Sequence, residues 1–166
     1  IVAAGPFTEL GEGIFTTARI FIGRLHADGS LDTTLNPGAN GAVYAVAAQP
    51  DGKILVGGSF TALGGGTGTT TRNRIGRLNA DGTVDPTFNP GANEEVYAMA
   101  VQPDAKVLVG GAFTGLGDGT GATARNRLGR LNLDGSVDTT FNPGADNVVH
   151  TVALQADGKM LVGGLF

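Results

Sequence analysis

Short apolar segments alternate with glycine-rich turns along the whole chain. One series contains four apolar segments of about six residues each, a usual strand length, at residues 43–49, 54–60, 73–79 and 83–88. Pro-Asp-Gly and Ala-Asp-Gly turns separate the first pair and the last pair, and a Gly- and Thr-rich loop joins the two pairs. Short strands bounded by Gly, Pro and Asp are typical of antiparallel hairpins. The pattern therefore predicts four short antiparallel strands.

The same series recurs with a fixed period of 53 residues, as the positions of Phe7, Phe60, Phe113 and Phe166 show. The repeats span residues 1–53, 54–106 and 107–159, and residues 160–166 start a fourth. Four antiparallel strands in about 50 residues is the size of one β-propeller blade. We therefore expect an all-β fold, with residues 1–166 forming a single array of three propeller blades that is part of a larger propeller or assembly.

The turn at Gln49-Pro50-Asp51-Gly52-Lys53 indicates a three-residue hairpin with a left-handed glycine. Proline sets φ at the first turn position, and Gly52 takes the left-handed position without a steric penalty. Ala105 stands at the equivalent position of the next repeat. Because a left-handed alanine costs on the order of 1 kcal/mol, we expect that turn to differ.

The turn geometry also predicts which residues face one another across the strands. Leu78 should lie opposite Val84, and Arg77 opposite Asp85. Equivalent charge pairs would be Arg24 with Asp32 and Arg130 with Asp138. The paired glycines at 57–58, 110–111 and 163–164 weaken a strand unless another backbone approaches closely. We expect tight packing between neighbouring blades to be that reason.

Two sequence motifs carry a resemblance to a known family. Residues 49–60 read QPDGKILVGGSF and residues 77–88 read RLNADGTVDPTF. Together they resemble the bacterial delta-sixty (delta-60) repeat, and the resemblance covers essentially the whole chain. It implies β-propeller blades in a large secreted or cell-surface protein, and it brings no catalytic residues.

Both ends of the chain align with the same strand of the repeat. Residues 1–7 (IVAAGPF) and residues 160–166 (MLVGGLF) each correspond to the second strand. Three blades are also fewer than the four to eight of closed propellers. We therefore expect the chain to be a segment of a longer repeat protein, or to assemble with other copies.

Composition narrows the classes of partner. The net charge of −4 provides no basic surface for nucleic acid. No apolar run approaches the roughly 20 residues that span a bilayer, so we expect no membrane insertion. The chain has no cysteine and therefore no disulfide or thiolate chemistry. A Gly- and Thr-rich, Lys-poor, mildly acidic composition favours an extracellular or cell-surface location.

Five residues form the candidate ligand-binding set. Tyr44 and Tyr97 share one repeat position, where the third repeat has His150. Stacked rings at this position could bind sugars, although an ordinary strand-face role is more common. The other candidates, Arg19, Arg72 and Arg125, recur just before the third strand. They could bind an anion or a glycan carboxylate, but pairing with loop carbonyls or with an aspartate of a neighbouring blade is the more common role.

No residue pattern indicates a metal site or a catalytic centre. The repeated aspartates could be calcium ligands, but each is explained as a turn residue or a partner of arginine. These aspartates are Asp28, Asp81, Asp134, Asp51, Asp104, Asp157, Asp32, Asp85 and Asp138. An enzyme would need residues that break the repeat symmetry, and the main ones are His26, His150, Glu94 and Glu95. We therefore expect no enzyme activity and no cofactor.

These observations favour a non-catalytic structural or interaction scaffold from a secreted or surface bacterial protein. Its partners would be other blades of the same parent chain or other copies. The alternative is a carbohydrate-binding, lectin-like propeller with one weak glycan site per repeat.

Overall fold

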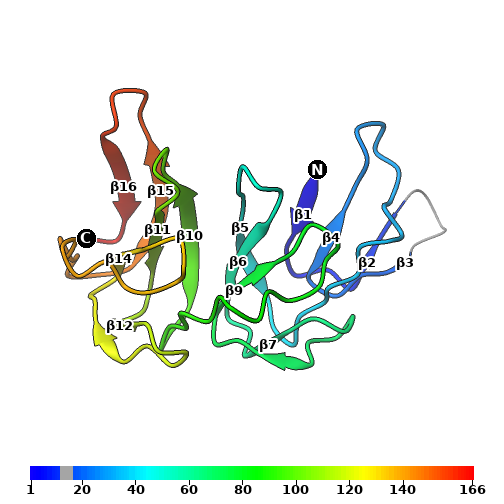
Figure 1. Ribbon diagram of the computed structural model, residues 1–166, viewed down its shortest axis with the longest axis horizontal. Helices are drawn as coiled ribbons and strands as arrows, with labels where there is room; N and C mark the ends of the chain where they lie inside the picture. Colours follow the sequence, from blue (N-terminus) through cyan, green and yellow to red (C-terminus); the bar gives the residue numbers. More distant parts are fainter. Residues whose placement is uncertain (12–16) are drawn as a thin grey trace.

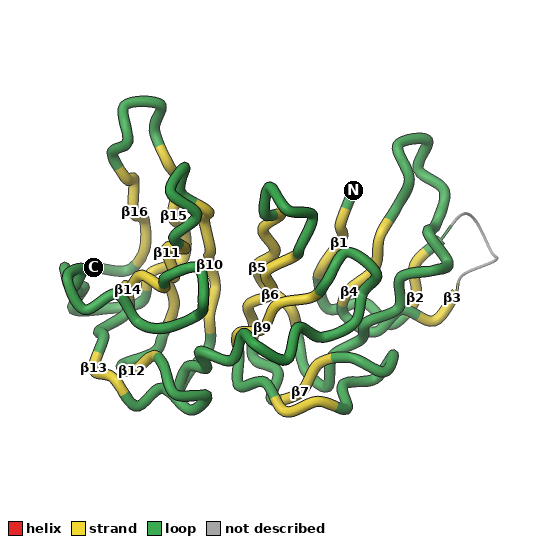
Figure 2. Tube along the Cα trace, viewed as in Figure 1, coloured by secondary structure: helices red, strands yellow, loops and turns green. Residues whose placement is uncertain are grey.

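The computed structural model describes residues 1–11 and 17–166, and these residues form only strands, turns and loops (Figures 1 and 2). The all-β fold class is therefore confirmed. No helix in these residues could cross a membrane.

Two three-stranded antiparallel sheets form the centre of the molecule. Each is a hairpin whose second strand also pairs with a third strand. The strands are β5 (Val43–Ala48), β6 (Ile54–Gly58) and β9 (Ile75–Leu78) in one sheet, and β10 (Val96–Val101), β11 (Val107–Gly111) and β14 (Leu128–Leu131) in the other. Strand β5 lies beside β10, so the first strands of the two sheets are neighbours (Figure 1).

A two-stranded sheet stands on each side of this centre (Figure 1). Strand β1 (Val2–Ala4) pairs with β4 (Ile22–Arg24), and β15 (Val149–Leu154) pairs with β16 (Met160–Gly164). Strand β15 lies beside β10 and continues the row of first strands. None of the sheets formed by the described residues closes on itself.

Each Gly- and Thr-rich loop contains a small two-stranded ribbon that the sequence pattern did not predict. The ribbons are β2 (Glu9–Leu10) with β3 (Thr17–Ala18), β7 (Ala62–Leu63) with β8 (Thr70–Thr71), and β12 (Gly115–Leu116) with β13 (Thr123–Ala124). Ribbons β7–β8 and β12–β13 lie at the end of the sheets opposite the hairpin turns (Figure 2).

The predicted fourth strand, residues 83–88, is not a strand. Only an isolated bridge between Leu78 and Val84 forms there, at the predicted register. The chain turns away because the Asp85 carboxylate accepts hydrogen bonds from the backbone N–H of Thr87 at 2.9 Å and from its hydroxyl at 2.7 Å. A local side-chain hydrogen bond of this kind competes with strand pairing. Each sheet therefore has three strands at most.

The turn at Ala105 does not differ from its glycine counterpart, contrary to the expectation. Ala105 adopts φ 64°, while Gly52 has φ 83°. The Ala105 N–H donates to the carbonyl of Gln102 at 2.9 Å, and that of Gly52 to the carbonyl of Gln49 at 3.0 Å. Hairpin pairing on both sides therefore holds alanine in the left-handed conformation.

The two glycines of each pair have different roles. A Cβ on Gly57 would lie 2.7 Å from Cγ1 of Val96 in β10, so this glycine permits close approach of the neighbouring sheet, as expected. A Cβ on Gly58 would instead collide with the backbone of Ala42 and Val43 in its own sheet. Gly58 lies opposite a β-bulge between Val43 and Ala45, which brings the two strands close together.

Candidate functional site

The three aromatic residues of the first strands form a continuous stack. The ring centroids of Tyr44 and Tyr97 are 5.3 Å apart, with 38° between the ring planes. Those of Tyr97 and His150 are also 5.3 Å apart, with a tilt of 43°. The structure therefore brings two of the predicted ligand-binding residues together and adds His150 to them.

Most of the stacking surface is used within the protein. Tyr97 lies between two rings and is half-buried, whereas Tyr44 at one end of the stack is 47% exposed. Burial raises the pKa of Tyr97, and the nearby charges of Glu95 and Glu94 raise it further. The stack thus offers an open ring at its ends and an electronegative flank near Tyr97.

The three candidate arginines are buried within their own repeats. The exposed fractions of Arg19, Arg72 and Arg125 are 4%, 7% and 6%. Nη1 of Arg72 donates to the carbonyl of Thr71 at 2.7 Å, and Nη2 donates to the carbonyl of Asp85 at 3.0 Å. Arg19 and Arg125 make the same kinds of contact. Each guanidinium therefore binds loop carbonyls, the more common of the two roles weighed from the sequence.

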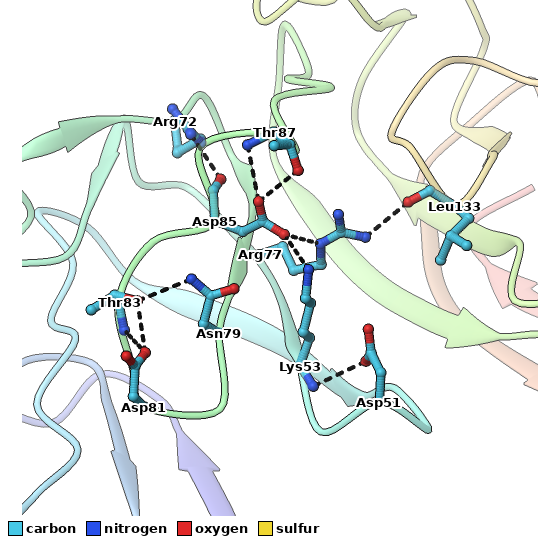
Figure 3. Close-up of polar contacts among 10 residues, drawn as sticks. All are labelled: Asp51, Lys53, Arg72, Arg77, Asn79, Asp81, Thr83, Asp85, Thr87 and Leu133. Carbon is cyan, nitrogen blue, oxygen red and sulfur yellow. Dashed lines mark hydrogen bonds and ion pairs between the residues drawn. The ribbon is translucent and has the colours of Figure 1, made fainter.

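A carboxylate shared by several donors recurs in the three repeats, and Figure 3 shows the one centred on Asp85. Oδ2 of Asp85 accepts from Nε of Arg77 at 2.9 Å and from Nζ of Lys53 at 2.8 Å, and Oδ1 faces Thr87. The predicted pairing of Arg77 with Asp85 is thus confirmed, as are the pairs of Arg24 with Asp32 and of Arg130 with Asp138.

These contacts control the ionisation of the shared carboxylate. Burial raises the pKa of Asp85, but hydrogen bonds from Lys53, Thr87 and Arg77 outweigh burial and hold the pKa well below its usual range. The hydroxyl of Thr34 and the guanidinium of Arg24 lower the pKa of Asp32 in the same way. The pKa of Asp138 is lowered by Lys106, Thr140 and Arg130. All three carboxylates are therefore charged at neutral pH.

The same arginines also connect neighbouring repeats. Nη1 of Arg77 donates to the carbonyl of Leu133 at 2.8 Å (Figure 3). Nη1 of Arg24 donates to the carbonyl of Ala80, also at 2.8 Å. The guanidinium carbon of Arg77 lies 4.2 Å from the ring centroid of Phe88, a cation–π contact. Arg77 thus binds one repeat through Asp85 and the next through Leu133.

The other repeated aspartates act as turn residues, as predicted. Asp81 accepts from the backbone N–H and the hydroxyl of Thr83 at 2.9 and 2.6 Å. Asp51 accepts from the backbone N–H of Lys53 at 3.1 Å. In residues 1–11 and 17–166, no group of three or more His, Asp or Glu side chains is arranged to hold a metal ion.

A hollow of about 530 Å³ lies at the turn ends of the three first strands. Its walls are the same positions of successive repeats, among them Gln49 and Pro50, Gln102 and Pro103, and Gln155 and Ala156. The sequence pattern predicts only strand ends and turns at these residues. Their recurrence beside the ends of three neighbouring first strands is the signal that could have identified them as a shared surface.

The remaining sequence candidates do not join these groups. The Gly- and Thr-rich loop at 64–71 ends in the ribbon strand β8. It therefore provides no helix N-terminus that could bind a phosphate. His26 is exposed in a hairpin turn, where its backbone N–H donates to the carbonyl of Ser30 at 2.8 Å. The described contacts of His26 are therefore those of a turn residue.

Comparison with protein families supports the propeller assignment. Residues 49–88 and 102–141 match the family model described as a domain of unknown function (DUF5122) beta-propeller. The two segments occupy equivalent positions of successive repeats, and each includes the hairpin turn, the second strand and the shared aspartate. Together with the all-β structure, the matches support an uncharacterised β-propeller repeat family. No curated protein matches the chain.

Proposed function

We propose that this chain is a non-catalytic structural or interaction scaffold built from β-propeller blades of the delta-60 type, with a 53-residue repeat. We assign it to a secreted or cell-surface bacterial protein. The family matches and the all-β structure support the blade assignment. The Gly- and Thr-rich, Lys-poor, mildly acidic composition supports the location.

The observation that carries this proposal is the use of the repeated charged residues. Arg77 donates both to Asp85 in its own repeat and to the Leu133 carbonyl in the next repeat. Arg72 is buried against the Asp85 carbonyl. Groups that could otherwise perform chemistry are engaged in holding sheets and turns together, as a rigid scaffold requires.

The β15–β16 sheet offers a surface for further blades or copies. Leu161 and Phe166 are 58% and 56% exposed, and Leu165 is 66% exposed. The equivalent residues of the two central sheets are buried: Leu55, Leu108, Phe60 and Phe113 are each at most 1% exposed. A further blade or the opposite end of a second copy, where Ile1 is 74% exposed, would cover this face.

Sedimentation velocity over a range of protein concentrations tests this proposal. We expect head-to-tail association that grows with concentration. A Leu161→Lys/Phe166→Lys double variant should remain monomeric, because lysine cannot be buried in the contact without a partner. Leu133→Lys is the matched control, since Leu133 is an exposed leucine (53%) outside this face. A wild-type chain that stays monomeric, or equal association by all variants, would count against the assembly role.

The aromatic stack favours a second candidate, a lectin-like propeller that binds glycans. Tyr44 presents an exposed ring at one end, and such rings pack against the C–H faces of sugars. A glycan array followed by titration of Tyr44→Ala tests this candidate. Loss of a wild-type glycan signal in the variant would support it, and an array without binding would remove it.

A further inference from the structure

An ion pair that recurs in the central sheets is left open at both ends of the array. The lysine before each second strand binds the shared aspartate at 2.8 Å, and the pairs are Lys53 with Asp85 and Lys106 with Asp138. Lys159 holds the same place before β16, but it binds Asp157 in its own turn and its side chain is 77% exposed. Asp32 is the shared aspartate that follows β4, and its one ionic partner among the described residues is Arg24. Lys159 and Asp32 therefore each lack the partner that the central sheets provide.

The sheets that carry these two charges are incomplete in complementary ways. Strand β6 pairs on both sides, with β5 and β9, whereas β16 pairs only with β15 and β1 pairs only with β4. The β15–β16 sheet thus lacks a third strand, and the β1–β4 sheet lacks a first strand. An unpaired strand edge readily pairs with another chain. If β16 paired with β4 of a second copy in place of β1, the result would be a sheet of three strands like the central ones.

Strand β16 matches the second-strand position more closely than β1 does. Residues 161–163 read Leu-Val-Gly, as do residues 55–57 and 108–110, whereas residues 2–4 of β1 read Val-Ala-Ala. Leucine and valine would bury more apolar surface in this position than the valine and alanine of β1.

The glycine of this triplet has a steric role that β1 does not fulfil. A Cβ on Gly57 would lie 2.7 Å from Cγ1 of Val96 in the neighbouring sheet. Val43 is the equivalent of Val96 one repeat earlier, and β1 presents Ala4 to it at the position of Gly57. Gly163 of β16 would leave the room that Val43 requires.

We propose that two copies of this chain join by strand exchange, in which β16 of one copy replaces β1 on β4 of the other and Lys159 binds Asp32. The register is that of β6 with β9, which places Met160 opposite Leu25. Strand β15 then precedes β5 of the second copy, so the exposed rings of His150 and Tyr44 meet and continue the aromatic stack. This inference rests on the proposed assembly role and specifies how the copies join.

Cysteine pairs test the register directly, because the chain contains no cysteine. A Met160→Cys/Leu25→Cys variant should form disulfide-linked dimers and longer multimers on mild oxidation, seen by non-reducing electrophoresis. Within one copy these positions lie in the sheets at opposite ends of the molecule (Figure 1). The matched control is Leu154→Cys/Leu25→Cys. Leu154 lies opposite Met160 on β15, about 10 Å from Leu25 after exchange, which is beyond the roughly 7 Å that a disulfide spans.

The ion pair is tested by Lys159→Gln, which should weaken association about tenfold in sedimentation velocity, the loss expected for one charged hydrogen bond. Lys159 is exposed, so its replacement leaves the fold of each copy unchanged. Asp157→Asn is the matched control, since it removes the present partner of Lys159 outside the contact, and should change the affinity less than about twofold.

Three results would overturn strand exchange while the assembly role stands. They are association without the cross-link from Met160→Cys/Leu25→Cys, equal cross-linking of both cysteine pairs, and wild-type affinity of Lys159→Gln. Sheets that merely stack face to face, about 10 Å apart, would give the first of these. A wild-type chain that stays monomeric would overturn strand exchange and the assembly role together, so the two proposals fail in distinguishable ways.

Discussion

Arg77 and Leu133 join two repeats through a single hydrogen bond, 2.8 Å from Nη1 to the carbonyl oxygen. The same guanidinium pairs with Asp85 at 2.9 Å, and its side chain is 6% exposed. Arg77 thus binds a carboxylate in its own repeat and a backbone carbonyl in the next repeat. Cohesion between repeats therefore involves a charged network as well as apolar packing.

Replacing Arg77 by methionine should lower the free energy of unfolding by about 2–3 kcal/mol, because Asp85 loses one of two cationic partners in a buried site. The matched control is Arg130→Met. Arg130 is 18% exposed and its Nη1 has only the 3.4 Å contact with Gln102, so we expect a loss of about 1 kcal/mol. Urea denaturation measures both values. Equal losses would show that the contact with Leu133 contributes nothing.

Stability should fall in acid because of the shared aspartates. Their pKa values are lower in the folded chain than the unfolded value of about 3.9, so their contribution is complete above that pH and is lost as the pH falls toward the folded pKa. The free energy of unfolding, measured by urea titration, should be flat above about pH 5 and decline below about pH 4.

Asp85→Asn identifies the origin of this decline. Asparagine does not ionise, so the variant should be less stable at neutral pH and should show a shallower loss of stability in acid. An acid slope identical to that of the natural chain would mean that Asp85 is not one of the groups responsible.

Ala105→Gly should stabilise the chain by about 0.5–1 kcal/mol, because glycine relieves the left-handed strain but adds freedom to the unfolded chain. The reciprocal variant Gly52→Ala should destabilise by about 1 kcal/mol. Its Cβ would meet only the Ala80 side chain at 3.7 Å, so the effect reports backbone conformation alone. Thermal unfolding measures the change in stability of both variants. Changes of the same sign would contradict the shared turn geometry.

Gly57→Ala should lower the free energy of unfolding by about 1–3 kcal/mol, because the new methyl group would overlap Val96 of the neighbouring sheet. Gly163→Ala is the control, since its Cβ would meet only the Thr151 methyl at 2.8 Å in the same sheet. Urea denaturation should show a smaller loss in the free energy of unfolding for Gly163→Ala than for Gly57→Ala. If Gly163→Ala loses as much stability as Gly57→Ala, close approach of the neighbouring sheet is not the reason for glycine at position 57.

Local features of this fold follow from the sequence. Turn chemistry fixed the hairpin register, and this register correctly placed Arg77 opposite Asp85 and Leu78 opposite Val84. The prediction of a fourth strand was wrong because alternation in residues 83–88 conceals a competing hydrogen bond, which the backbone N–H of Thr87 donates to the Asp85 carboxylate. The ribbon β7–β8 was missed because two-residue strands carry no periodic signal.

Contacts that cross long stretches of chain could not be predicted. Lys53 reaches Asp85 across 32 positions, and Arg77 reaches Leu133 across 56. A pattern of residue types shows that such groups recur, but not which sheet lies beside which.

Differential scanning calorimetry tests most directly the central claim that neighbouring repeats form one rigid scaffold. Repeats held together by Arg24, Arg77 and the shared apolar packing should unfold as one unit. We expect a single transition, with calorimetric and van't Hoff enthalpies that agree. Two or more separate transitions, or a van't Hoff enthalpy far above or below the calorimetric value, would contradict the account.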